Sequence, residues 1–187
     1  MWWQWALSIP VSENPLFDET GEFAGVGQSG PVFFLAAVFN VSGTAERTIT
    51  VPRGKALFFP LLNTAADNVG VEPPLMSVDE LYNLAAGFMD ATTALHATID
   101  GIPAGNLFAY RAASPEPYTV TLPETDNVYQ FFGFDVSGPI YPQVADGFWL
   151  MLAPRSVGPH EINFGGTVGE PFNFSLDITY HITVVAR

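Results

Sequence analysis

Asp146 is the carboxylate of this sequence best placed for chemistry. It stands directly before residues 148–152, and an ionised carboxylate beside so apolar a stretch needs a partner. Arg155 and Arg111 are the obvious countercharges. A second interpretation stays open, because Asp146-Gly147 is also a turn-forming pair in which the carboxylate bonds its own backbone.

His160 is the histidine most suited to act with Asp146. It begins the segment "HEINF" and shares its parity with the apolar residues there, which predicts an inward-pointing ring at a strand start. The alternative is a hydrogen-bonded histidine with no chemical role. Because general acid–base catalysis needs its groups in one cleft, the hypothesis is a hydrolase or lyase site of Asp146, His160 and Arg155, with Arg111 binding an anionic group.

The acidic loop near the N-terminus has the residue types of a calcium site. Asp18, Glu19 and Glu22 lie in a segment rich in glycine and proline, and Ca²⁺ prefers carboxylate and backbone oxygens presented by loops. The sequence lacks the D-x-D-x-D-G spacing of a dedicated calcium loop. A solvated acidic loop therefore remains the alternative to a metal site at these three residues.

Aromatic residues offer a different kind of binding. Trp2, Trp3 and Trp5 crowd the N-terminus, and an exposed tryptophan ring stacks well on the apolar face of a sugar. Alternation places Trp3 and Trp5 on the core side. Trp2 falls on the other side, so we expect it to be the exposed member and a contact for carbohydrate or another small molecule.

Composition narrows the classes of partner. The 187 residues carry 6 Lys+Arg and 19 Asp+Glu, a net charge of −13, which excludes a nucleic-acid backbone as a probable target. The chain has no cysteine, and its longest apolar run, 32–39, is too short to insert across a membrane. Its acidic, lysine-poor and aromatic-rich composition favours a secreted or periplasmic protein. A mean hydropathy of +0.24 favours self-association through apolar surface.

The periodicity of apolar and polar residues predicts the strands that would position these side chains. Alternation of apolar and polar residues is strongest over 172–184, and Gly/Pro turn signals separate many short segments. The sequence therefore predicts a mostly β chain: an antiparallel two-sheet sandwich, jelly-roll-like, forming one domain over 1–187. Strands are expected at 2–9, 32–39, 47–51, 56–62, 95–99, 107–111, 118–122, 128–134, 148–152, 160–164 and 172–184.

One α-helix is expected to be inserted in this pattern, at about 77–91. Ser77 and Glu80 have the spacing of a capping box, in which each side chain bonds the backbone N–H of the other residue. Apolar residues follow at helical spacing, so one face should pack on a sheet. Pro73 and Pro74 prevent an earlier start.

Five blocks of the sequence carry a resemblance: "WWQWALSIP", "NPLFDETG", "GQSGPVFFLAA", "VPRGKALFFPLLN" and "DGFWLMLAP" followed by "GPHEINFGG". In this order they resemble a set of uncharacterised exported bacterial proteins. The resemblance implies export and transfers no catalytic residue. It also implies a cysteine near Ala24 and another near Ile49, and this chain has neither.

Three hypotheses for function remain. The first is an exported, non-catalytic sandwich that binds a ligand or assembles with copies of itself. The second is the carbohydrate- or ester-active hydrolase or lyase that uses Asp146 and His160. The third is an adhesion module stabilised by calcium.

Overall fold

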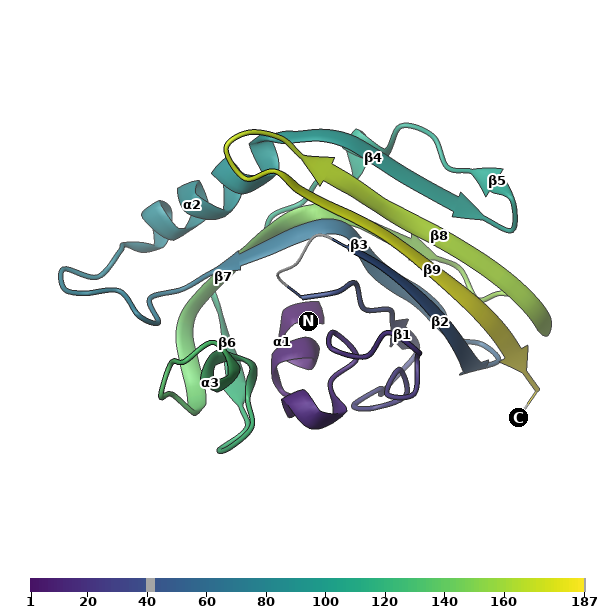
Figure 1. The fold of residues 1–187 in the computed structure, drawn as a ribbon, viewed down its shortest axis with the longest axis horizontal. Coiled ribbons are helices and arrows are strands. Elements are labelled where there is room, and N and C mark those ends of the chain that lie inside the picture. Colours follow the sequence, from purple (N-terminus) through teal and green to yellow (C-terminus); the bar gives the residue numbers. More distant parts are fainter. Residues whose placement is uncertain (40–42, 187) are drawn as a thin grey trace.

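The backbone forms two β-sheets with short helices at their margins. A computed structural model describes residues 1–39 and 43–186. One sheet has four strands in the order β1-β3-β7-β6, and the other has five in the order β2-β9-β8-β4-β5. Figure 1 shows the long strands β8 and β9 crossing above β3 and β7, with the N-terminal segment below. This mostly β, sandwich-like architecture confirms the predicted fold class.

The strands have the following bounds: β1 Val32–Phe34, β2 Gly43–Pro52, β3 Ala56–Ala66, β4 Thr92–Ile99, β5 Ile102–Pro103, β6 Tyr118–Leu122, β7 Gly138–Leu152, β8 Gly158–Val168 and β9 Phe174–Val185. Most neighbouring pairs are antiparallel, as expected. Two pairs, β1–β3 and β2–β9, are parallel. Both sheets are therefore mixed. In the five-stranded sheet, the connection after β2 carries the chain to the other sheet, so β2 pairs with the distant strand β9.

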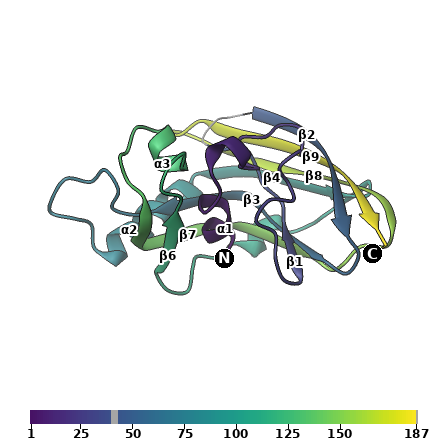
Figure 2. The same ribbon diagram turned by 90° about the horizontal axis from the view of Figure 1, so that it is seen from below.

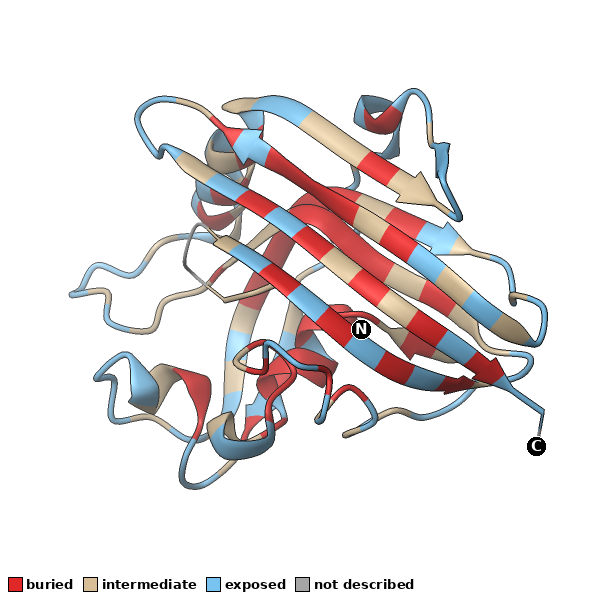
Figure 3. Cartoon of the chain, turned by 45° about the vertical axis from the view of Figure 1, so that its right-hand side comes forward, coloured by how far each residue is buried: buried red, intermediate tan, exposed pale blue. Residues whose placement is uncertain are grey.

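Alternation along the strands fills the space between the sheets. On β9, Leu176, Ile178, Tyr180, Ile182 and Val184 are buried and the intervening residues face outward. Figure 3 shows the resulting bands of buried and exposed residues on β2 and β9. Phe59 of β3 and Phe164 of β8 meet at 4.5 Å between ring centroids. The core thus lies where the inward faces of the two sheets meet.

Helix α2, Val78–Asp90, confirms the inserted helix. Ser77 accepts a hydrogen bond from the Glu80 N–H, and the Glu80 carboxylate accepts one from the Ser77 N–H. Leu81, Ala85 and Met89 form its buried face, which contacts β3 and β7. The capping box and the apolar stripe therefore act as the sequence predicts.

The N-terminal segment is helical, so the strand predicted at 2–9 is wrong. Helix α1 spans Trp2–Leu7 and lies against β6, beside α3 (Figure 2). Trp2, Trp3 and Trp5 are all buried, as are Ala6 and Leu7. A helix buried on nearly every side carries no clear polar stripe, and the coincidental alternation of large residues imitated a strand.

Three other expected strands are shorter or absent. Residues 107–111 contain a 3₁₀ helix, η2 Leu107–Tyr110, and 128–134 contain helix α3, Val128–Phe131. Asn127 and Gln130 form a second capping box, a sequence signal for α3 that the strand prediction passed over. The strand expected at 32–39 ends at Phe34. A short 3₁₀ helix, η1 Val11–Glu13, lies in the N-terminal loop.

Candidate functional site

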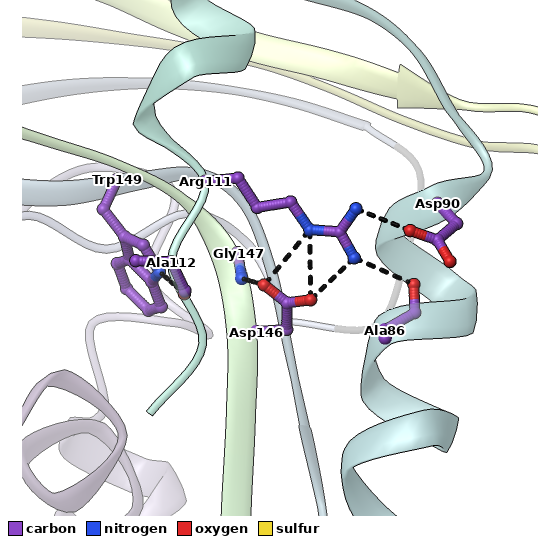
Figure 4. Close-up of polar contacts among 7 residues, drawn as sticks. All are labelled: Ala86, Asp90, Arg111, Ala112, Asp146, Gly147 and Trp149. Carbon is purple, nitrogen blue, oxygen red and sulfur yellow. Dashed lines mark hydrogen bonds and ion pairs between the residues drawn. The ribbon is translucent and has the colours of Figure 1, made fainter. Parts of the chain in front are cut away.

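Asp146 and Arg111 form a close ion pair between β7 and the segment after η2 (Figure 4). Arg111 Nη2 and Nε donate to Asp146 Oδ2 at 2.7 Å and 3.1 Å. Nη1 donates to Asp90 Oδ1 at 2.6 Å, and Nη2 also donates to the Ala86 carbonyl at 3.2 Å. The Gly147 N–H donates to Asp146 Oδ1 at 2.7 Å. The predicted countercharge and the alternative backbone bond are thus both present.

This cluster holds the end of α2 on β7. Asp146 is buried, with 4% of its surface exposed, and it faces a guanidinium that also reaches the last turn of α2. The hydrogen bonds to Asp146 raise the pKa of Arg111 above its ordinary value, with Asp90 adding to the effect. Because most guanidinium donors are engaged, the cluster suits fastening of the helix better than binding of an anionic ligand. The ligand-binding role of Arg111 stays a prediction.

His160 and Arg155 meet at a different carboxylate, Asp100, which follows β4. His160 Nδ1 and Asp100 Oδ2 lie 2.9 Å apart, and Arg155 Nη2 donates to the same oxygen at 2.5 Å. Burial opposes ionisation of Asp100. Hydrogen bonds from His160, the Glu161 N–H and Arg155 outweigh that effect and lower its pKa to about 2. Sequence patterns did not single out Asp100 as a site residue, because only the β4–β5 turn brings it to β8.

Ser156 completes an arrangement that resembles a serine hydrolase relay in its order of groups. Ser156 Oγ lies 3.3 Å from His160 Nε2, and Asp100 holds the other ring nitrogen. However, Nε2 lies closer to the Ser156 carbonyl oxygen, at 2.9 Å. A carbonyl oxygen only accepts, so this contact favours N–H donation from Nε2. A ring nitrogen engaged in that way has no lone pair to take the serine proton.

The structure does not unite Asp146 with His160. Asp146 lies on β7 of the four-stranded sheet and His160 on β8 of the five-stranded sheet. Among residues 1–39 and 43–186, no hydrogen bond or ion pair links one cluster to the other. Of the three residues in the hypothetical catalytic site, only His160 and Arg155 share a partner.

Asp18 of the expected calcium loop is used inside its own loop. It is buried, and its two carboxylate oxygens accept hydrogen bonds from Thr20, Gly21 and Phe23. Burial opposes its ionisation, but these bonds outweigh it and lower its pKa. The side chains of Glu19 and Glu22 are exposed. Within the described part of the chain, no group of three or more His, Asp or Glu residues is placed to hold a metal ion.

Arg47 is a buried cation that was not among the predicted site residues. Its exposed fraction is 1%, and its guanidinium lies 5.3 Å from the centre of the Tyr180 ring. It donates to the Tyr180 hydroxyl at 2.9 Å and, at 2.6–3.1 Å, to the carbonyls of Pro15, Asp18, Ala36 and Ala37. Its shared parity with Ile49 and Val51 was the available signal for burial.

The structure contains an aromatic pocket of about 860 Å³. Among the described residues, no charged side chain lines it. The lining residues are Trp2, Trp3, Leu7, Leu16, Ala37, Val38, Phe39, Asn63, Thr64, Ala65, Phe88, Val128, Tyr129, Phe132, Phe134, Phe172, Asn173, Phe174 and Leu176. A volume of this size, an apolar lining and a few amide and hydroxyl groups are typical of small-molecule sites.

Elements far apart in the sequence build the pocket walls. One wall is a chain of ring contacts, with centroids 6.0 Å apart for Trp3 and Phe39 and 5.4 Å apart for Phe39 and Phe132. A further ring contact in the lining pairs Phe88 of α2 with Phe172, at 4.7 Å between centroids. Phe132 follows α3 and Phe172 precedes β9, and the full lining also includes residues within α1, β3, α2, α3 and β9.

The pocket has a buried floor and an exposed rim. Trp2 and Trp3 are only 3% and 9% exposed, whereas Phe132, Phe134 and Phe172 are 40–46% exposed. The expected exposure of Trp2 is therefore wrong, because its ring is enclosed and its Nε1 donates to the Leu35 carbonyl at 3.1 Å. Trp2 nonetheless contributes to the lining of the pocket, and its role as a ligand contact stays a prediction.

Comparison with known proteins adds little. No family model and no curated protein matches the chain. A chain in the solved structure of PbICP-C in complex with falcipain-2 aligns with a TM-score of 0.32 and 12% identity, over 83% of this chain and 100% of that one. Within the described residues, no helix has the length and apolar character needed to cross a membrane.

Proposed function

We propose that this protein binds an uncharged, largely apolar small molecule in the aromatic pocket and carries out no chemistry on it. The observation that carries the proposal is the pocket itself, about 860 Å³, whose described lining is rich in aromatic side chains and holds no charged group. Placing a charged ligand there would remove its hydration without supplying a countercharge. A neutral ligand avoids that cost and gains from burial of its apolar surface.

The exposed rings at the rim support the proposal further. Phe132, Phe134 and Phe172 present large apolar areas to solvent, and their burial by a ligand would be favourable. The positions of the titratable groups agree with a role without catalysis, since Asp146 and His160 are engaged in separate clusters outside the pocket lining. Export and self-association stay predictions from the composition.

Titration with a neutral, environment-sensitive dye such as Nile red tests the proposal. We expect saturable binding with an increase in dye fluorescence. Phe132→Ser and Phe172→Ser should each weaken it by about ten-fold, because each removes an aromatic contact. Phe108→Ser is the matched control, since Phe108 is 52% exposed and lies outside the pocket lining.

The results of this titration either support or overturn the proposal. Loss of binding in the two rim variants with retention in Phe108→Ser supports the pocket as the site. Equal loss in all three variants, or no saturable binding to the unmodified protein, would overturn the proposal. Displacement of the dye by a neutral oligosaccharide but not by a hydrocarbon-rich ligand would overturn the apolar class and favour carbohydrate.

A further inference from the structure

We propose that Arg53, Lys55 and Arg155 form a binding site for a small oxyanion at the end of the sandwich remote from α2. This inference is independent of the aromatic pocket. Arg53 and Lys55 lie in the connection from β2 to β3, and Arg155 lies in the connection from β7 to β8. Both connections pass between the two sheets.

Two adjoining hollows bring these residues together. The first, of about 530 Å³, is lined by Arg53, Gly54, Pro154, Arg155, Ser156 and Val157. The second, of about 520 Å³, has Lys55 in its lining and shares Arg53 and Gly54 with the first. In the part of the chain that the structure describes, no carboxylate side chain lines either hollow. The two hollows adjoin at the shared residues Arg53 and Gly54, and together we call them the basic depression.

The concentration of positive charge is unusual for this chain. The sequence has 6 Lys+Arg against 19 Asp+Glu, and three of those cations line the depression. Arg47 is enclosed in the core, and Arg111 is held by two carboxylates. In a protein of net charge −13, a local cluster of cations is where an anion gains a favourable potential.

The donors in the depression are only partly used. The Arg53 side chain has no hydrogen-bond or ion-pair partner among residues 1–39 and 43–186. Lys55 Nζ donates to the Gly30 carbonyl, which leaves further N–H groups of the ammonium. Arg155 binds Asp100 through Nη2, and this carboxylate also faces His160. Asp100 therefore contacts Arg155 and His160, whereas in the described part of the chain neither Arg53 nor Lys55 has an ion-pair partner.

This arrangement fits a compact oxyanion. A guanidinium donates two parallel hydrogen bonds to phosphate, sulfate or carboxylate oxygens, and an ammonium adds a point charge beside it. The Ser156 hydroxyl lies in the same lining and supplies one more donor. The shallow, solvent-accessible form of the depression suits the anionic group of a small molecule, either a free ion or a group carried by a sugar.

Side-chain NMR of ¹⁵N-labelled protein tests the site, with sodium phosphate titrated against sodium chloride at matched ionic strength. We expect saturable shifts of the Arg53 and Arg155 Nε–H signals and of the Gly54 and Ser156 amides. Arg53→Gln should weaken phosphate binding about ten-fold, since it removes a guanidinium donor. A parallel titration with glucuronate distinguishes a free ion from an anionic sugar, by which of the two binds more tightly.

The control separates local recognition from net charge. Arg53→Gln combined with Glu72→Gln keeps the net charge at −13, because one cation and one anion are removed. Glu72 is exposed, in the connection between β3 and α2. Continued loss of binding in the double variant supports the site. Recovered binding, unsaturated shifts spread over the surface, or an unchanged affinity in Arg53→Gln would overturn it.

Discussion

Two arginines, Arg47 and Arg111, hold this structure together in opposite ways. Arg47 is almost wholly enclosed, and its partners are four backbone carbonyls and the Tyr180 hydroxyl, all of them neutral. Arg111 has 31% of its side chain exposed and is paired with the carboxylates of Asp90 and Asp146. One centre solvates its charge with dipoles, and the other neutralises it with opposite charges.

The difference reflects what each centre connects. Arg47 lies on β2 and joins the N-terminal loop, at Pro15 and Asp18, to the segment that follows β1. Irregular segments offer many unpaired carbonyls, and a guanidinium can satisfy several of them at once. Arg111 instead joins a strand to the end of a helix, where Asp90 and Asp146 supply charge. Arg47 therefore fixes the positions of irregular backbone segments, and Arg111 connects β7 to the end of α2.

The largest expected effect comes from removing the buried guanidinium. Arg47→Met should lower the free energy of unfolding by about 3–5 kcal/mol, because several buried acceptors lose their partner while the volume stays similar. Urea denaturation followed by tryptophan fluorescence measures the change. Glu46→Gln, at the exposed neighbouring position, is the control. A stable Arg47→Met variant would show that desolvation of the cation cancels its hydrogen bonds.

A smaller effect is expected at Arg111, and its two carboxylate partners provide a matched pair. Asp146→Asn should cost about 2–3 kcal/mol, because the side chain of Asp146 is 6% exposed and its charge faces Arg111 at 2.7 Å. Asp90→Asn should cost less than about 1 kcal/mol, because the Asp90 side chain is 66% exposed. Equal costs in the two variants would contradict the distinction drawn between a buried and an exposed ion pair.

The smallest effect concerns pH at Asp100, a third centre that combines charge pairing with partial exposure. Its folded-state pKa of about 2 lies below the ordinary value of 3.8, so its ionised form stabilises the fold. That contribution is complete above about pH 4 and is lost as the pH falls through about 2. Asp100→Asn should therefore be less stable than the unmodified protein at pH 6, with a difference that shrinks towards pH 2. Urea denaturation at pH 6, 3 and 2.5 measures it, and a constant difference would refute the assignment.

Local patterns predicted much of this architecture. Alternation over β9 identified a strand whose inward face is now seen in the core, and the Ser77–Glu80 capping box located the start of α2. The need of Asp146 for a countercharge led to Arg111 as one of two candidates. The strand and the helix were predictable because their patterns involve residues close together in the sequence. The countercharge was predictable because a buried charge requires a partner.

Patterns of the same kind were misleading at the N-terminus and at α3. Trp2–Leu7 alternates like a strand but is a helix enclosed by other elements, so its side chains had no solvent-facing stripe to reveal their period. At Val128–Phe131 the competing apolar pattern was preferred to a capping box formed by Asn127 and Gln130. Short segments give periodicity too few residues to distinguish the two structures.

The sequence by itself determined that the chain is an acidic, mostly β protein with one principal helix, because charge and side-chain period are properties of the chain. Only the tertiary structure decided which residues meet. Asp146 and His160 lie in different sheets, distant carbonyls enclose Arg47, and residues from widely separated segments line the aromatic pocket. Periodicity assigns a residue to a face, whereas its neighbours depend on which strands become adjacent when the chain crosses between sheets.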